Sequence, residues 1–432
     1  MLLPTEAENL ILSLVQPLEE TETVCLEAAG DRILAQPATS ELDFPYWDNS
    51  AMDGYAVKYS DVNNCSANYP CVLKIIEEIP AGYCPQKTIE SGESARIFTG
   101  AMLPAGADTV IIQEETRREG DRVFILSPPA NPQAFVRRRG EFYRRGNLGK
   151  NMGTPGSQPD VSGTQPNTPG AGTGAPPLLL PGISLKAPEI AILATVQVTQ
   201  VAVYRRPRVA IFSTGDELVM PSQPLQPGQI VDSNQYALAA AVASQGAIPL
   251  RFGIVPDQPQ QLRETIVQAV AEADMVLSTG GVSVGDYDYV EQILAELGGE
   301  IHIRSVAVKP GKPLTVATFA NGCLYFGIPG NPVSALVSWW RFVQPALRKL
   351  SGLRDGWQPI FIPARSCHSL RSDGRRETYF WGRFDKGEFK LAGGSHSSGN
   401  LINLAGTNAL AVLPIGETEI APGAAVQVML IG

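Results

Sequence analysis

The chain has 432 residues and a formal net charge of -9. This length accommodates roughly two to four domains with sizeable cores, and the acidic balance argues against a general nucleic-acid binder, since phosphate backbones select basic surfaces. Six cysteines without a CxxC pair and only three histidines disfavour a disulfide framework and a His-rich zinc site. No stretch approaches the roughly 20 apolar residues of a spanning helix, and no signal peptide is recognised. We therefore expect a cytoplasmic multidomain protein with no membrane or nucleic-acid partner.

The first predicted element is a helix in the segment TEAENLILSLVQPL. Thr5 and Glu8 have the spacing of a capping box, and apolar residues at positions 10, 11, 14 and 15 form one helical face. Short β-like runs then alternate with Gly/Pro turns between residues 72 and 126. This alternation predicts a compact β domain.

Residues 151–177 are rich in Pro, Gly, Ser and Thr and nearly free of apolar side chains. Such a composition buries too little surface to offset the entropy of ordering the chain. We therefore expect a disordered surface insert here.

Strands and helices alternate after the insert. RVAIFST predicts a strand, and SNQYALAAAVASQG predicts a helix capped by Ser233 or Asp232 and ended by Gly246. Further strand–helix pairs follow, and they imply a mainly parallel sheet covered on both faces. From Trp357 the chain returns to short strands and turns, which predicts a small C-terminal β domain.

Four polar segments of this βα region follow or flank predicted strands. Ligands bind beyond the carboxyl ends of the strands in such sheets, so we expect these segments to share one rim. The candidate residues are Ser213, Thr214, Gly215 and Glu217 in FSTGDEL; Ser278, Gly280, Gly281, Ser283, Gly285 and Asp288 in LSTGGVSVGDYDY; Lys309 and Lys312 in KPGKP; and Gly330 in GIPGNPVSA.

The rim combines features of an anion site with carboxylates. A tight Gly turn before a helix N-terminus presents free N–H groups to an anion, and carboxylates beside an anion imply a bridging cation. We expect Glu217 and Asp288 to hold Mg²⁺ against phosphate oxygens, with Lys309 and Lys312 neutralising the remaining charge. Each segment alone is explained equally well by an ordinary cap or turn, and it is their convergence that favours a site for phosphoanhydride chemistry.

Other enzyme classes fit the sequence less well. Neither a Walker A pattern nor GxGxxG followed by an acidic residue is present, which disfavours ordinary NTPases and dinucleotide enzymes. No histidine lies near Ser213, Ser278 or Ser283 in the sequence, which disfavours a serine nucleophile.

A family resemblance joins these segments to others along the chain. NSAMDGYAV, RIFTGAMLPAGADTVIIQEE, STGGVSVGDYDY, KPGKP, IPGNPVSA and NLAGTNALAVLP occur in this order. They resemble the molybdopterin molybdenumtransferase family, the Mo-insertases that include the C-terminal enzyme domain of gephyrin. The resemblance covers nearly the whole chain except the insert.

The resemblance implies an elongated homodimer of four-domain subunits. The expected domains are a helical linking domain (residues 1–40 and 136–204, with the insert), a β-rich domain (residues 41–135), a molybdopterin-binding βα domain (residues 205–354) and a C-terminal β-barrel (residues 355–432). The βα domain is expected to resemble the molybdopterin adenylyltransferases.

The activity that the resemblance implies is Mg²⁺-dependent insertion of molybdate into adenylyl-molybdopterin, with release of AMP and the molybdenum cofactor. A molybdopterin-adenylylating enzyme is the expected substrate donor. By resemblance, Asp53 and Thr99 approach the cleft from the partner subunit. Further residues that match family positions around the ligand are Glu217, Asp257, Asp288, Lys309, Lys312, Pro329, Pro332 and Ser398. Asp53, Thr99 and Asp257 also suit simple turn or cap roles.

The chain departs from the family pattern at three places. Phe142 stands where relatives carry an acidic residue, Ser305 where they often carry a basic one (with Arg304 adjacent), and Gln197 where they often carry Gly. None of these positions belongs to the carboxylate set. Two other functions stay open: adenylylation of molybdopterin with ATP, because the βα domain is shared, and a non-enzymatic gephyrin-like scaffold.

Overall fold

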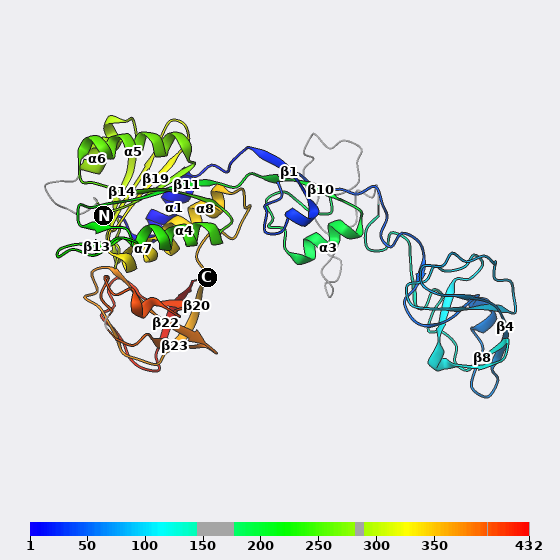
Figure 1. The fold of residues 1–432 in the computed structure, drawn as a ribbon. Helices are drawn as coiled ribbons and strands as arrows, with labels where there is room; N and C mark the ends of the chain where they lie inside the picture. The colour runs from blue at the N-terminus through cyan, green and yellow to red at the C-terminus, as the bar shows by residue number, and fades with distance from the viewer. Residues whose placement is uncertain (145–176, 281–288, 395, 432) are drawn as a thin grey trace, which may run out of the picture.

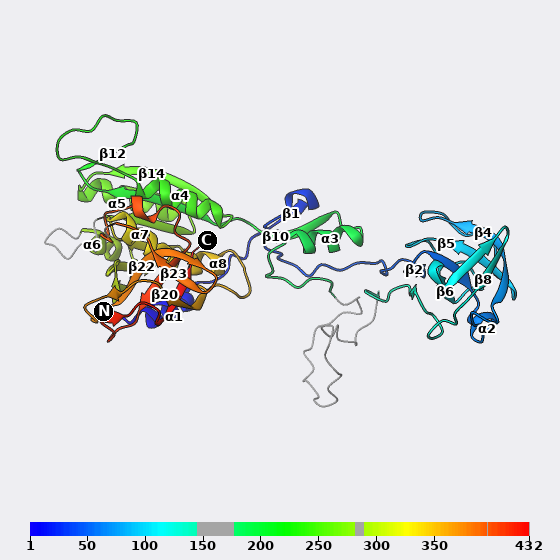
Figure 2. The same ribbon diagram turned by 90° about the horizontal axis from the view of Figure 1, so that it is seen from below.

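The computed structural model describes residues 1–144, 177–280, 289–394 and 396–431. The molecule is elongated, with a large body at one end, a small middle section, and a β lobe at the other end (Figures 1 and 2). Both chain termini lie in the large body (Figure 1). This arrangement confirms the predicted multidomain α/β plus β class, whereas the exact domain boundaries stay a prediction.

The β lobe is built on a six-stranded sheet with the order β6-β3-β5-β4-β8-β7. Its neighbours pair antiparallel except β4 and β5, which pair parallel. A Cβ atom on Gly54, at the start of β3, would lie 1.9 Å from the Ile111 carbonyl oxygen, so only glycine fits between these strands. The elements are β3 (Gly54–Val57), α2 (Tyr59–Val62), β4 (Cys71–Ile79), β5 (Glu93–Ile97), β6 (Thr109–Ile112), η2 (Gln113–Glu115), β7 (Thr116–Glu119) and β8 (Arg122–Ile125).

The middle section joins segments that are far apart in sequence. β1 (Thr21–Cys25) pairs antiparallel with β10 (Gln200–Tyr204), and α3 (Ala187–Thr195) packs beside them with η1 (Leu26–Ala28). Nearer the β lobe, β2 (Asn49–Ser50) pairs with β9 (Val136–Arg137). Of the predicted insert, all but Pro177 lies outside the described residues.

The large body contains a six-stranded sheet with the order β14-β11-β15-β19-β18-β16. The first four strands are parallel to one another, and β18 alone among the six runs the other way, pairing antiparallel with both β19 and β16. This topology confirms a mainly parallel sheet. The strands are β11 (Arg208–Thr214), β14 (Ile248–Val255), β15 (Met275–Thr279), β16 (Glu300–Ser305), β18 (Pro313–Thr318) and β19 (Leu324–Ile328), and the short pair β12 (Leu218–Val219) and β13 (Ile230–Val231) lies beside them.

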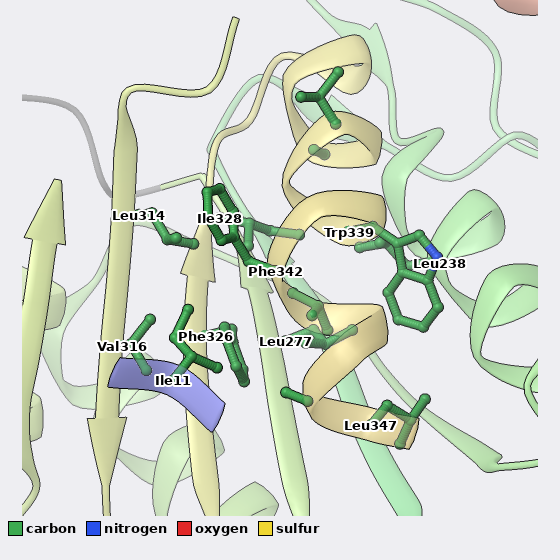
Figure 3. Packing of buried hydrophobic residues seen from close by; sticks show 14 of the residues in the cluster. Ile11, Leu238, Leu277, Leu314, Val316, Phe326, Ile328, Trp339, Phe342 and Leu347 are labelled. Atoms are coloured by element: carbon green, nitrogen blue, oxygen red, sulfur yellow. The ribbon is translucent and has the colours of Figure 1, made fainter. Parts of the chain in front are cut away.

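Helices cover both faces of this sheet. α5 (Pro259–Glu272) and α6 (Tyr289–Glu296) pack on one face. The other face carries α1 (Pro4–Leu14), α4 (Asn234–Ser244), α7 (Pro332–Ser338), the π-helical turn η3 (Trp339–Val343) and α8 (Gln344–Leu350). Figure 3 shows this second core, where Trp339, Phe342 and Leu347 pack against strand residues such as Leu277 and Phe326.

The capping box predicted for Thr5 and Glu8 is wrong. α1 begins at Pro4, and the N–H of Leu3 donates to Glu6 Oε2 at 2.9 Å. The proline sets the first helical residue earlier than the Thr/Glu spacing suggested. Glu8 is buried instead and pairs with the buried guanidinium of Arg341. The predicted apolar face of the helix is confirmed, since it packs into the core of the large body.

The predicted ends of α4 are confirmed. Ser233 precedes the helix, but it is Asp232 Oδ1 that accepts the N–H groups of Asn234 and Gln235, at 3.1 and 3.3 Å. Gly246, with φ of +78°, follows the last turn. Asp232 therefore satisfies the backbone donors that the helix start leaves free.

The C-terminal region forms a closed barrel of five strands, because β22 pairs with both β23 and β24. β17 (Val308–Lys309) of the βα region pairs parallel with β22, so the barrel is attached beside the KPGKP segment. Arg341 reinforces the junction, since its Nε donates to Tyr379 Oη at 3.0 Å. The elements are β20 (Phe361–Ser366), β21 (Leu370–Arg371), β22 (Glu377–Asp385), β23 (Glu388–Leu391), η4 (Ile402–Leu404), β24 (Ala409–Leu413), β25 (Glu419–Ile420) and β26 (Ala425–Leu430).

All six cysteines are free thiols. Among the described residues, no helix has the length and apolar character needed to cross a bilayer.

Candidate active site

A cleft of about 1300 Å³ lies where β11, β15 and β19 end, and the C-terminal barrel forms its opposite wall. The sheet edge and the barrel together bring the four predicted segments to one cavity. The predicted residues that line it are Thr214, Gly215, Glu217, Asp257, Gly280, Lys309, Lys312, Pro329, Gly330, Pro332 and Ser398.

The floor of the cleft is made of closely packed backbone. A Cβ atom on Gly280 would lie 2.4 Å from the carbonyl oxygen of Thr214, and one on Gly330 would lie 3.5 Å from the Cα of Gly280. Gly280 also has a φ of +87°, which disfavours any residue with a Cβ atom. The packing of the strand ends therefore requires glycine at position 280.

We expect Gly280→Ala to destabilise the protein by about 1–3 kcal/mol, because the methyl group both clashes with Thr214 and strains the backbone. The measurement is the midpoint of thermal unfolding. Gly246→Ala is the matched control, because its φ is +78° but no atom lies within 4 Å of its added Cβ atom. If both variants lose equal stability, the steric clash with Thr214 contributes nothing to the destabilisation, which contradicts the prediction.

Three carboxylates gather on one side of the cleft: Asp216, Glu217 and Asp257. Partial burial, together with the charges of Asp216 and Glu217, raises the pKa of the Asp257 carboxyl above its ordinary value. A Cβ atom on Gly215 would lie 2.6 Å from Glu217 Oε2, so the glycine leaves space for that carboxylate to fold back over the turn. In the part of the chain that the structure describes, no lysine or arginine forms an ion pair with these three carboxylates. Carboxylate oxygens without a cationic partner suit Mg²⁺.

The described residues contain no cluster of three or more metal-ligating side chains in binding geometry. Asp288, the second predicted magnesium ligand, lies outside the described residues, as do Gly281, Ser283 and Gly285. The carboxylate oxygens of Asp216, Glu217 and Asp257 are chemically suited to hold a cation, and the geometry of the metal ligands stays a prediction.

Asp257→Asn is expected to raise the unfolding midpoint of the ligand-free protein by roughly 1–2 °C, because it removes one repulsive charge from a partly exposed cluster. The raised pKa means that the folded chain binds this proton more tightly than the unfolded chain does. Asp257 thus contributes stability below its ordinary pKa of 3.8, and that contribution is lost as pH rises through the folded pKa. Thermal unfolding between pH 3.5 and 7 tests this sign: the variant should gain most over wild type at pH 7, and an equal or lower midpoint there contradicts it.

Basic side chains line the other side of the cleft. Lys309 Nζ lies 3.7 Å from Asp373 Oδ2, and the charge of Arg376 also acts on that carboxyl. Lys312 forms no ion pair in the part of the chain that the structure describes. Arg371 also lines the cleft and pairs with Glu419 at 3.0 Å. Cations therefore face the carboxylates across one cavity.

The barrel wall contains residues that the sequence reasoning missed. They are Arg371, Arg376, Thr378, Tyr379, Trp381 and His396. The Trp381 and His396 rings stack with centroids 4.3 Å apart, and His396 Nε2 donates to the Ala392 carbonyl at 3.0 Å. The sequence signal for the two arginines was the basic segment that precedes β22, RSDGRRE, which no motif marked as part of the site.

Two predicted residues lie beneath the cleft instead of lining it. Ser213 and Ser278 are both fully buried. Ser213 Oγ donates to Asp232 Oδ1 at 3.0 Å, and Ser278 Oγ accepts from Tyr325 Oη at 2.6 Å. The two side chains point to opposite faces of the sheet, because Ser278 lies in register with Phe212 and not with Ser213. Their hydroxyls serve the packing beneath the cleft floor.

Asp53 and Thr99 lie together in the β lobe, away from the cleft of their own chain (Figure 1). The Thr99 N–H and Oγ1 donate to Asp53 Oδ1 at 2.8 and 2.7 Å. These bonds, with the nearby charge of Arg96, hold the pKa of the Asp53 carboxyl below its ordinary value. Asp53 is thus a preorganised, ionised carboxylate, and among the described residues of its own chain it contacts no predicted site residue other than Thr99.

Comparisons with known proteins agree with this architecture. Residues 3–161 match the MoeA N-terminal region (domain I and II), residues 210–349 a probable molybdopterin binding domain, and residues 363–431 the MoeA C-terminal region (domain IV). The chain is 57% identical to the molybdopterin molybdenumtransferase of Nostoc sp., covering 98% of this chain and 92% of that one. It is 32% identical to the Haemophilus influenzae enzyme of the same name, covering 86% and 83%. The crystal structure of the molybdopterin biosynthesis MoeA protein from Pyrococcus horikoshii OT3 matches with a TM-score of 0.81 and 27% identity over the full length of both chains.

Proposed function

Because the chain belongs to the molybdopterin molybdenumtransferase family and is an enzyme of molybdenum cofactor biosynthesis that inserts molybdenum, we propose the course of its reaction. Adenylyl-molybdopterin and molybdate enter the cleft at the carboxyl edge of the βα sheet. Molybdate is inserted into the dithiolene, the phosphoanhydride bond is cleaved, and AMP and the molybdenum cofactor leave.

One observation carries this proposal: carboxylates and cationic side chains line a single cavity whose floor is glycine backbone. Adenylyl-molybdopterin and molybdate are both anionic, so the cationic side with Lys309, Lys312 and Arg376 is where their charge is compensated. Gly280 and Gly330 let a phosphate approach the main chain, and Pro329, Pro332 and Ser398 line the adjoining edge.

The acidic side is proposed to serve the cation. Mg²⁺ held by Glu217 and Asp288 supplies a Lewis acid and a template for the phosphate oxygens. Asp257, whose pKa is raised by its carboxylate neighbours, lies close enough to Glu217 to share in that role. Thr214 and Gly215 form the turn that holds Glu217 at the rim.

We further propose a homodimer in which the β lobe of one subunit completes the cleft of the other. The Asp53–Thr99 pair is preorganised and ionised, yet it lies at the far end of the elongated chain from the cleft (Figure 2). A two-fold arrangement places equivalent surfaces of two such chains against each other. A molybdopterin-adenylylating enzyme is the proposed substrate donor, and the cytoplasmic location stays a prediction.

The test is AMP release from adenylyl-molybdopterin by the purified protein, with molybdate and Mg²⁺ each present or omitted. We expect AMP to appear with both and the rate to drop when either is omitted. A rate of AMP formation that does not depend on molybdate contradicts the insertion step. Consumption of ATP with molybdopterin favours the adenylylation reaction instead, and a folded dimer that turns over neither substrate favours a scaffold.

A further inference from the structure

A buried carboxylate that the proposed reaction does not use lies directly under the cleft. The Asp232 side chain is 2% exposed, and no lysine or arginine in the described residues pairs with it. Instead its oxygens accept hydrogen bonds from neutral donors. Oδ1 accepts from Ser213 Oγ at 3.0 Å and from the N–H groups of Asn234 and Gln235, whereas Oδ2 accepts from Gln235 Nε2 at 2.5 Å.

The donors connect Asp232 to the loops that form the cleft. Ser213 immediately precedes Thr214 and Gly215, and its Oγ in turn accepts from Thr279 Oγ1 at 2.8 Å. Thr279 immediately precedes Gly280. The ends of β11 and β15 are therefore held to Asp232 through two successive hydroxyl contacts.

The same network reaches two more segments through the start of α4. Asn234 Nδ2 donates to the carbonyl oxygen of Gly330 at 2.8 Å. Gln235 Oε1 accepts from the Gly253 N–H at 3.1 Å, where β14 bulges. Asp232 is thus connected, directly or through one further residue, to β11, β15, β14 and the loop that precedes α7.

A buried carboxylate of this kind is costly unless its acceptor capacity is used. The four donor groups have little freedom to reorient, since each must point at one of the two carboxylate oxygens. An amide at position 232 would turn its NH₂ group toward Gln235 Nε2, so two donors would face each other. The geometry of the cleft floor therefore depends on whether the side-chain atom that faces Gln235 Nε2 is an acceptor oxygen or a donor NH₂ group.

We infer that Asp232 is a positioning residue, whose buried carboxylate sets the relative placement of Thr214–Gly215, Gly280 and Gly330 at the cleft floor. The inference rests on the proposed function of the cleft, because it assigns Asp232 to that reaction without any contact to substrate. Misplacement of reacting groups by about 1 Å can cost on the order of 100-fold in rate.

The experiment exchanges the carboxylate and the amide between positions 232 and 235, whose side chains are hydrogen-bonded to each other. Asp232→Asn and Gln235→Glu are made singly and together, and kcat and KM for AMP release, hydrogen exchange of residues 211–218 and 327–330, and the unfolding midpoint are measured. We expect each single variant to lose about 30-fold in kcat/KM and to exchange faster in both segments. The double variant, which restores one donor and one acceptor, should recover to within about threefold of wild type.

Asp274→Asn is the matched control, because Asp274 accepts from Arg205 and Arg208 at the opposite edge of the same sheet. It should lower the unfolding midpoint while leaving kcat/KM within about twofold. Failure of the double variant to recover, or an equal loss of kcat/KM in Asp274→Asn, overturns the positioning role. If wild type releases no AMP, the proposed function fails, and the hydrogen-exchange pattern of the swap still decides whether Asp232 fixes the loops.

Discussion

Glu217→Gln is expected to lower kcat for molybdenum insertion about 100- to 1000-fold without loosening the fold. Glu217 contributes a carboxylate to the acidic side of the cleft, and its side chain is exposed. Its structural contact is made by the main chain, where its carbonyl accepts the Ile230 N–H at 2.9 Å. The amide therefore removes the charge that the proposed cation site needs and leaves that backbone contact in place.

The measurement for this variant is AMP release at saturating substrate over a range of Mg²⁺ concentrations. Glu264→Gln is the matched control, since Glu264 lies exposed on α5 and contacts Gln260. The control should match wild type in rate and in magnesium dependence. A Glu217→Gln rate within about threefold of wild type would remove Glu217 from the catalytic set.

Asp53→Asn is expected to lower turnover about 100-fold, although the residue lies in the β lobe, far from its own cleft. Asparagine keeps an oxygen that accepts from the Thr99 N–H and hydroxyl, so the local turn should persist while the negative charge is lost. The reason for the rate loss, under the proposed dimer, is that this charge belongs to the cleft of the partner subunit.

Mixed dimers distinguish this account from an indirect effect. When Asp53→Asn and Glu217→Gln chains are co-expressed with different tags, random pairing makes about half of the dimers mixed. If the site is shared, each mixed dimer contains one cleft that carries both changes and one that carries neither. Unfractionated protein should then reach about a quarter of wild-type turnover, whereas tag-purified mixed dimers with no more turnover than the two parent variants would contradict a shared site.

The sequence placed the four rim segments at the ends of strands, and the structure brings residues of all four to one cavity. Thr214 is the last residue of β11, Gly280 directly follows β15, and Gly330 is the second residue after β19. The carboxyl ends of these parallel strands meet at one edge. The same reasoning failed for the hydroxyls of Ser213 and Ser278, because a residue still inside the strand alternates between faces. One position along the strand decides whether a side chain lines the cleft or supports it.

The barrel wall could not be predicted from local patterns. Arg376 and Trp381 reach the cleft because β17 pairs with β22 and because Arg341 is held between Glu8 and Tyr379. These contacts join residues more than 30 positions apart, so no spacing within a motif indicates them. The misplaced capping box has the same origin: Glu8 contributes to that buried junction, and Pro4 and Glu6 define the helix start instead.

The most direct test of the central claim is a single-turnover reaction of wild-type protein with adenylyl-molybdopterin, molybdate and Mg²⁺, in which AMP and pterin-bound molybdenum are quantified together. Insertion coupled to phosphoanhydride cleavage in this cleft predicts that the two products appear at the same rate and in equal amounts, and that Glu217→Gln suppresses both. AMP formed without bound molybdenum, or both products formed at the wild-type rate by Glu217→Gln, would contradict it.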